Sequence, residues 1–261
     1  MIPINKINVL GVKVCAISRN DILTTLQDWM HSGQSHYVCV TGVHGVMESQ
    51  NNPQLLNIHN NAGLVTPDGM PLVWLSRLKG FKNTERGYGP DLMLNICEYF
   101  SKRDCTHFFY GGAEGVPELL VKKLTQKIPN LKIAGMYSPP FRKLTNKEDA
   151  EIIERINTLK PNIVWVGIST PKQEIWMSEH VNKFRGTILI GVGAAFDFHA
   201  GLKRQAPRWM QDFGFEWLFR LITEPRRLWK RYLINNPKFI WLITKQLWRE
   251  YISKRVRSTT C

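Results

Sequence analysis

A carboxylate stands in a loop that is stiff and follows a short apolar run. Asp68 comes after residues 64–66 and lies between Pro67 and Pro71, which restrict the backbone on both sides. A carboxylate at the end of a strand faces any ligand that binds at that edge of a sheet. The same residue can instead cap the helix expected after it, and the pattern alone favours the cap.

A threonine, two glycines and a histidine follow one another after a second apolar run. Residues 36–41 end in Thr41, and His44 stands between Gly42 and Gly45. Glycine lets the backbone approach a ligand closely. A plain strand-to-helix turn explains the same pattern, and the pattern alone favours that interpretation.

Two further segments are suited to bind an anion. Gly111 and Gly112 precede a helix expected over residues 116–127, and Lys172 and Gln173 open another helix. Backbone N–H groups at the start of a helix can bind phosphate. The glycine pair is neither a complete GxGxxG nor a P-loop, and a tight connection accounts for it equally well.

Asp197 follows a fourth apolar run and a glycine turn, where it can bind a ligand or anchor the loop. Polar residues after four strands of one sheet favour a nucleotide-type ligand.

The sequence contains no D-x-D motif and no His/Cys cluster that suits zinc. We therefore expect no metal and no cofactor, and a transferase of this kind needs backbone amides or Lys and Arg to neutralise a leaving diphosphate.

Alternating strand and helix patterns position these residues. Buried strands that do not alternate between apolar and polar residues predict an α/β fold, with a Rossmann-like, mostly parallel sheet and helices on both faces. Ligands then bind beyond the carboxyl ends of the strands. The strands are expected at residues 9–14, 36–41, 64–66, 106–110, 131–136, 163–166 and 187–190.

The last quarter of the chain has a different character. The net charge of the 261 residues is +14, and residues 202–261 carry 14 Lys and Arg against four Asp and Glu. Five of the nine tryptophans also lie there. Basic residues interleaved with Trp and Leu are typical of helices at a membrane interface. We predict a catalytic domain over residues 1–201 and a basic, helical, membrane-docking appendage over residues 202–261.

The cysteines, the N-terminus and the lengths of the apolar runs indicate the cellular compartment. The five cysteines form no CxxC pair, which argues against a disulfide framework and fits a reducing compartment. The N-terminus lacks the pattern of a signal peptide, and no apolar run has the roughly 18–20 residues that a spanning helix needs. Membrane contact is therefore expected to be peripheral.

Thr41 and six segments, in the same order along the chain, resemble the WecG/TagA/CpsF family of bacterial glycosyltransferases over nearly the whole chain. The resemblance rests on Thr41 and on the segments TPDGMPLVW (66–74), GPDLM (89–93), GGAEG (111–115), VGISTPKQE (166–174), GVGAAFDFHAG (191–201) and APRWMQDFGFEWLFRLITEPRRLWKRY (206–232). Members of this family are inverting enzymes that use UDP-sugars. They act on undecaprenyl-diphosphate-linked acceptors in the synthesis of teichoic acid, enterobacterial common antigen, capsule or exopolysaccharide.

The resemblance implies roles for individual residues. Asp68 is expected to be the catalytic base with Thr41 beside it, and Gln173 matches a pocket residue of the family. Many relatives carry Asn two residues after the Thr, where this chain has Val43 followed by His44. This departure leaves the donor sugar open. Tail arginines are expected to reach the diphosphate: Arg220, Arg227 and Arg231, with Arg226 as a further candidate.

The expected partners follow from the same resemblance. They are a UDP-sugar donor, a polyprenyl-diphosphate-linked acceptor and the anionic inner face of the plasma membrane, and a homo-oligomer in which the appendage packs on a second subunit stays open. A nucleic-acid-binding protein is the alternative, but it needs its basic residues spread over a folded face. A dinucleotide-dependent oxidoreductase needs GxGxxG, which is missing.

Overall fold

Six parallel strands form the central sheet, as the apolar runs predict. The computed structural model describes residues 3–259, without the side chains of residues 254 and 256–259. The strand order is β4-β3-β8-β7-β5-β6, and every neighbouring pair is parallel. The strands are β3 (His36–Thr41), β4 (Leu64–Pro67), β5 (Thr106–Gly111), β6 (Lys132–Tyr137), β7 (Ile163–Gly167) and β8 (Ile188–Gly191).

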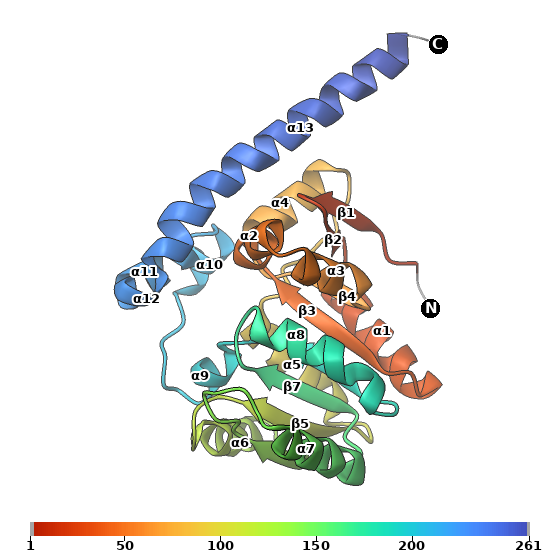
Figure 1. Cartoon of the computed structure of the whole chain (residues 1–261), viewed down its shortest axis with the longest axis vertical. Coiled ribbons are helices and arrows are strands. Elements are labelled where there is room, and N and C mark those ends of the chain that lie inside the picture. Colours follow the sequence, from red (N-terminus) through yellow and green to blue (C-terminus); the bar gives the residue numbers. More distant parts are fainter. Residues whose placement is uncertain (1–2, 260–261) are drawn as a thin grey trace.

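Helices cover both faces of this sheet (Figure 1). Successive residues of a strand point to opposite faces, and Val164 and Trp165 accordingly belong to two different hydrophobic clusters. The cluster around Trp165 includes residues of α1 (Arg19–Ser32), α5 (Gly89–Phe100) and α6 (Val116–Lys127). The cluster around Val164 includes residues of α2 (Val43–Asn51), α3 (Pro53–Asn61), α4 (Met70–Leu78), α7 (Asn146–Leu159) and α8 (Lys172–His180). The short 3-10 helix η1 (Val181–Lys183) follows α8.

The N-terminal segment is a hairpin, so the prediction of one strand over residues 9–14 is wrong. β1 (Lys6–Val9) pairs antiparallel with β2 (Val12–Cys15). Leu10 and Gly11 both have positive φ, 50° and 89°, as the tightest hairpin turns require. The buried apolar positions shift from Ile7 and Val9 to Val12 and Val14 across this turn, and a single strand over residues 9–14 overlooks that shift.

The chain after β8 is helical, as predicted. Short helices lead to the long α13 (Asn235–Thr259), which extends past the body of the sheet (Figure 1). The predicted domain boundary at residue 202 falls between α9 (Ala195–His199) and α10 (Arg208–Asp212). Among residues 3–259, no helix is long and apolar enough to cross a membrane. These elements are α9 (Ala195–His199), α10 (Arg208–Asp212), α11 (Glu216–Thr223), α12 (Pro225–Trp229), the π-helical turn η2 (Lys230–Ile234) and α13 (Asn235–Thr259).

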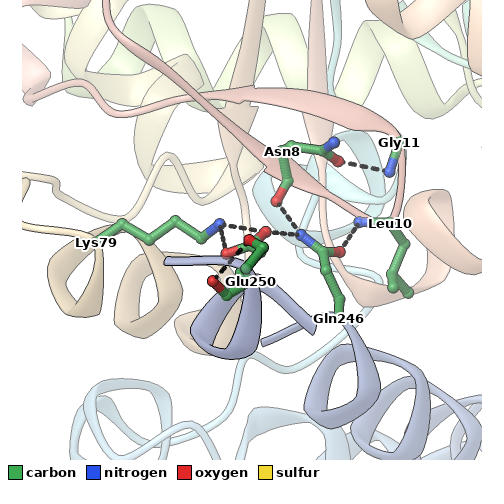
Figure 2. Close-up of polar contacts among 7 residues, drawn as sticks. Asn8, Leu10, Gly11, Lys79, Gln246 and Glu250 are labelled. Atoms are coloured by element: carbon green, nitrogen blue, oxygen red, sulfur yellow. Dashed lines mark hydrogen bonds and ion pairs between the residues drawn. The ribbon is translucent and has the colours of Figure 1, made fainter. Parts of the chain in front are cut away.

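The long helix α13 is anchored to the catalytic domain by apolar and polar contacts. Phe239 and Ile243 are buried in the cluster around Val164. One and two turns further along, Gln246 and Glu250 face the hairpin and the end of α4 (Figure 2). These four residues follow one another at intervals of three or four, the spacing that places side chains on one face of a helix.

Figure 2 shows how the polar part of this contact is built. The side-chain oxygen of Gln246 accepts a hydrogen bond from Leu10 N at 2.8 Å, and its nitrogen donates to Asn8 O at 2.9 Å. Glu250 pairs with Lys79, the residue directly after α4, at 2.8 Å. We call Gln246, Glu250 and these three partners the α13 clasp.

Candidate functional site

The carboxyl ends of β3 and β4 place Thr41 and Asp68 side by side. Thr41 is opposite Pro67 in the sheet register, and Asp68 N donates a hydrogen bond to Thr41 O at 3.0 Å. Thr41 is 2% exposed. The two residues therefore meet at the edge where open α/β sheets bind ligands.

Asp68 does not cap the helix that follows it. The N-cap of α4 is Gly69, which has no side-chain cap hydrogen bond. Asp68 Oδ1 instead accepts from Gly89 N, at the start of α5, at 3.2 Å. Its Oδ2 has no hydrogen-bond partner among residues 3–259. The carboxylate is thus fixed by one oxygen and leaves the other for a ligand.

A pocket surrounds Asp68 and brings together side chains from distant parts of the chain. Its walls come from the ends of β3, β4, β7 and β8 and from the appendage, which closes one side of it. Seven of the residues predicted from the sequence line it: Thr41, His44, Asp68, Gln173, Arg220, Arg227 and Arg231. We call this the Asp68 pocket.

A larger cavity adjoins the Asp68 pocket. It has a volume of about 840 Å³ and lies beyond the ends of β5, β6 and β7. Ser169, Gly193, Ala194 and Arg227 line both spaces, so the two lie next to each other. Three predicted residues line this neighbouring cavity without lining the Asp68 pocket: Gly112, Lys172 and Asp197.

Two predicted residues line neither space. A Cβ on Gly111 would stand 2.6 Å from the backbone of Gly167, so this glycine permits close packing of two strands. The side chain of Arg226 is exposed. Asp197, although it lines the neighbouring cavity, also pairs with Lys203 at 2.8 Å, which is the anchoring role considered for it.

Several buried polar atoms of the Asp68 pocket have no hydrogen-bond partner in the part of the chain that the structure describes. Native proteins satisfy most buried polar groups, so clustered exceptions mark where a polar ligand fits. The pocket offers both acceptors and donors of this kind: Thr41 Oγ1, His44 Nδ1, Gln173 Oε1, Arg220 Nε and Arg231 Nε.

The charges in the pocket are unevenly distributed. Burial lowers the pKa of His44 to about 3, and the nearby Arg231 and Arg220 act in the same direction. The imidazole is therefore neutral near pH 7. Burial raises the pKa of Asp68, against the lowering effect of Arg86. A carboxylate with a raised pKa is a stronger base, and three arginines beside it suit an anionic leaving group.

Sequence reasoning missed several residues that support the site. Arg86 donates to the main-chain oxygen of Asp68 and pairs with Glu216 of α11. Glu174 is 1% exposed and accepts a hydrogen bond from the Gln173 amide nitrogen at 3.0 Å, which fixes the Gln173 side chain at the pocket wall. The sequence held one signal for Glu216, since it is the only acidic residue in the aromatic run at residues 213–219.

No group of three or more His, Cys, Asp or Glu suited to a metal occurs within residues 3–259. The unpartnered polar atoms and the arginines together form a pocket suited to a phosphorylated, hydroxyl-rich ligand beside a carboxylate base.

Comparison with known proteins agrees with this chemistry. The profile of the "Glycosyl transferase WecG/TagA/CpsF family" matches residues 7–253. An N-acetylglucosaminyldiphosphoundecaprenol N-acetyl-beta-D-mannosaminyltransferase of Bacillus subtilis is 28% identical over 87% of this chain and 88% of its own. Proteins of the same name from Bacillus spizizenii and Staphylococcus aureus are 29% and 28% identical, over 76% and 73% of this chain and 74% and 72% of their own.

Proposed function

The chain belongs to the WecG/TagA/CpsF family of glycosyltransferases, and we propose that it moves a hexosyl group from a UDP-sugar to an undecaprenyl-diphosphate-linked saccharide with inversion at the anomeric carbon. One observation carries this proposal. The Asp68 carboxylate faces a pocket that three arginines line and in which several buried polar atoms have no partner among the described residues. The relatives named above transfer a sugar to a lipid-linked acceptor, which supports the same class of acceptor here.

The reaction is a single displacement. A hydroxyl of the acceptor saccharide attacks the anomeric carbon from the side opposite the leaving group, and Asp68 Oδ2 takes the hydroxyl proton. The new C–O bond forms as the bond from the anomeric carbon to the phosphate oxygen breaks, and UDP leaves with the electron pair. One displacement inverts the configuration. Proton removal by a positioned base contributes typically 10²–10⁴-fold in rate.

Three arginines stabilise the leaving diphosphate in this mechanism. Arg220 is on α11, Arg227 on α12 and Arg231 on the π-helical turn, and all three face the Asp68 pocket. Arginine forms paired hydrogen bonds to phosphate oxygens. Because these side chains supply the positive charge, we expect turnover without a divalent metal.

The neighbouring cavity is suited to the nucleotide of the donor. Gly112 and Lys172 lie in its wall near the starts of helices, and Tyr110 and Trp176 add aromatic surface. Arg227 lines both spaces, at the junction where a diphosphate would lie between nucleoside and sugar. The sugar then projects toward Asp68 and His44.

The appendage is suited to reach a lipid-linked acceptor at the cytoplasmic face of the membrane. It exposes large aromatic side chains on a basic segment, the pattern of an interfacial helix. These are Trp209, Trp229, Trp241 and Trp248, each between 45% and 63% exposed. We propose peripheral attachment to an anionic membrane surface through this segment.

A donor screen tests the proposal. The purified protein is incubated with a panel of UDP-sugars and a short polyprenyl-diphosphate-linked N-acetylglucosamine, and products are detected by mass spectrometry. We expect one donor to give a product lengthened by one sugar, with an anomeric configuration opposite to the donor's by NMR. A folded protein that binds UDP yet transfers no sugar to this acceptor would contradict the proposal.

A further inference from the structure

Arg86 joins the loop of Asp68 to the appendage. It lies between α4 and α5, and its Nε donates a hydrogen bond to the main-chain oxygen of Asp68. Its Nη2 pairs with Oε2 of Glu216, the first residue of α11. The guanidinium also lies over the ring of Tyr88, 4.1 Å from the ring centre. One side chain thus contacts both the site and the segment that covers it.

The loop that carries Arg86 holds Asp68 and the residue before it. Gly87 N donates to Pro67 O at 2.8 Å, and Gly89 N donates to Asp68 Oδ1 at 3.2 Å. A displacement of Arg86 would therefore move the loop that orients the carboxylate. With the appendage packed on the catalytic domain, as in this structure, the Arg86 guanidinium holds the main chain of Asp68. Asp68 Oδ2 then has no hydrogen-bond partner among the residues described.

The pair of Arg86 and Glu216 is shielded from water. Its side chains are 16% and 11% exposed. A shielded charge that loses its partner is unfavourable and seeks another. Besides Glu216, the carboxylate that acts on Arg86 is that of Asp68. If the appendage withdraws Glu216, Arg86 is left beside the base.

We propose that Glu216 is a positioning residue of the appendage, which keeps Arg86 off the Asp68 carboxylate and so makes the base available only when the appendage is docked. This inference rests on the proposed function, in which Asp68 accepts the proton of the acceptor hydroxyl. It adds a way for the appendage to act on the base itself, apart from the arginines that it supplies to the pocket.

The electrostatics of Asp68 agree with this assignment. Burial raises its pKa, Arg86 and Arg220 lower it, and Glu216 raises it. Arg231 and Tyr88 also face it. Loss of the Glu216 charge should therefore lower the pKa of Asp68, and loss of the Arg86 charge should raise it.

Paired substitutions test the proposal. In Glu216→Gln, turnover should fall by about tenfold to a hundredfold, the scale of a misplaced catalytic group. Asp68 is active when deprotonated, so the acid limb of the rate profile should move to lower pH. In Arg86→Gln the acid limb should move to higher pH. The control Asp212→Asn removes the same charge from an exposed position of α10 and should leave rate and profile unchanged.

A measurement independent of turnover separates this inference from the proposed function. The Asp68 carboxyl is titrated by ¹³C NMR, with its signal assigned by its loss in Asp68→Asn. A fall of its pKa in Glu216→Gln, and not in Asp212→Asn, supports the pairing even if Asp68 proves not to be the base. An unchanged pKa in Glu216→Gln overturns the inference. If Glu216→Gln does not fold, Arg86→Gln decides, and a pKa that does not rise there overturns the inference equally.

Discussion

Removing the Gln246 side chain should loosen α13 from the catalytic domain. Its amide makes two hydrogen bonds to the backbone of the hairpin, to Leu10 N at 2.8 Å and to Asn8 O at 2.9 Å. A net contribution of roughly 0.5–1.5 kcal/mol each gives about 1–3 kcal/mol for Gln246→Ala. That shifts the docking equilibrium by about 5- to 150-fold. Phe239 and Ile243 stay buried, so the appendage should loosen without global unfolding.

Hydrogen exchange of the hairpin measures this effect directly, because the Leu10 amide donates to Gln246. In Gln246→Ala this amide should exchange faster, while the core amides of β3 should not change. Thr244→Ala is the matched control, since Thr244 is exposed and its hydroxyl donates only within α13 to Ile240 O. Equal Leu10 exchange in the two variants would refute the clasp as a docking contact.

Three further predictions follow from the site and the appendage. Arg227→Ala should lower kcat/KM roughly five- to 150-fold, equivalent to about 1–3 kcal/mol, as expected for a lost charged hydrogen bond. Arg226→Ala, at a neighbouring exposed arginine that lines neither space, should change kcat/KM by less than about threefold, and equal effects would remove Arg227 from diphosphate binding. The protein should co-sediment with anionic vesicles less strongly as salt rises, and equal binding to neutral vesicles would contradict an electrostatic attachment. Turnover should be unchanged in excess EDTA, and a loss that magnesium or manganese restores would show that the arginines do not suffice.

The sheet and its binding edge could be predicted because buried parallel strands leave a strong local signal. Runs such as residues 36–41 and 163–166 contain almost only apolar and β-favouring residues, and they form β3 and β7. The rule that ligands bind at the carboxyl ends of strands then marked Asp68 as one of several candidates, and only the family resemblance singled it out as the base. The hairpin turn at Leu10 was missed because residues 9–12 form a short, nearly continuous apolar run, in which the shift of the alternation from residues 7 and 9 to 12 and 14 is easily overlooked.

Contacts across the appendage could not be predicted from local patterns. Arg220 and Arg231 are more than 150 residues from Asp68 in the sequence, and only the family resemblance suggested that they meet. Arg86 and Glu216 share no motif, so their pairing became visible only in the fold. Gly111 shows a further ambiguity, because a glycine that permits strand packing and one that permits phosphate binding look the same in a sequence.

The single-turnover rate of Asp68→Asn tests the catalytic role of Asp68 most directly. Asn keeps an oxygen that can accept from Gly89 N, so the fold and the affinity for UDP should be preserved. It cannot take a proton, so the rate of sugar transfer should fall at least about a hundredfold. A rate within a fewfold of the parent, with unchanged melting temperature and UDP affinity, would show that Asp68 is not the base.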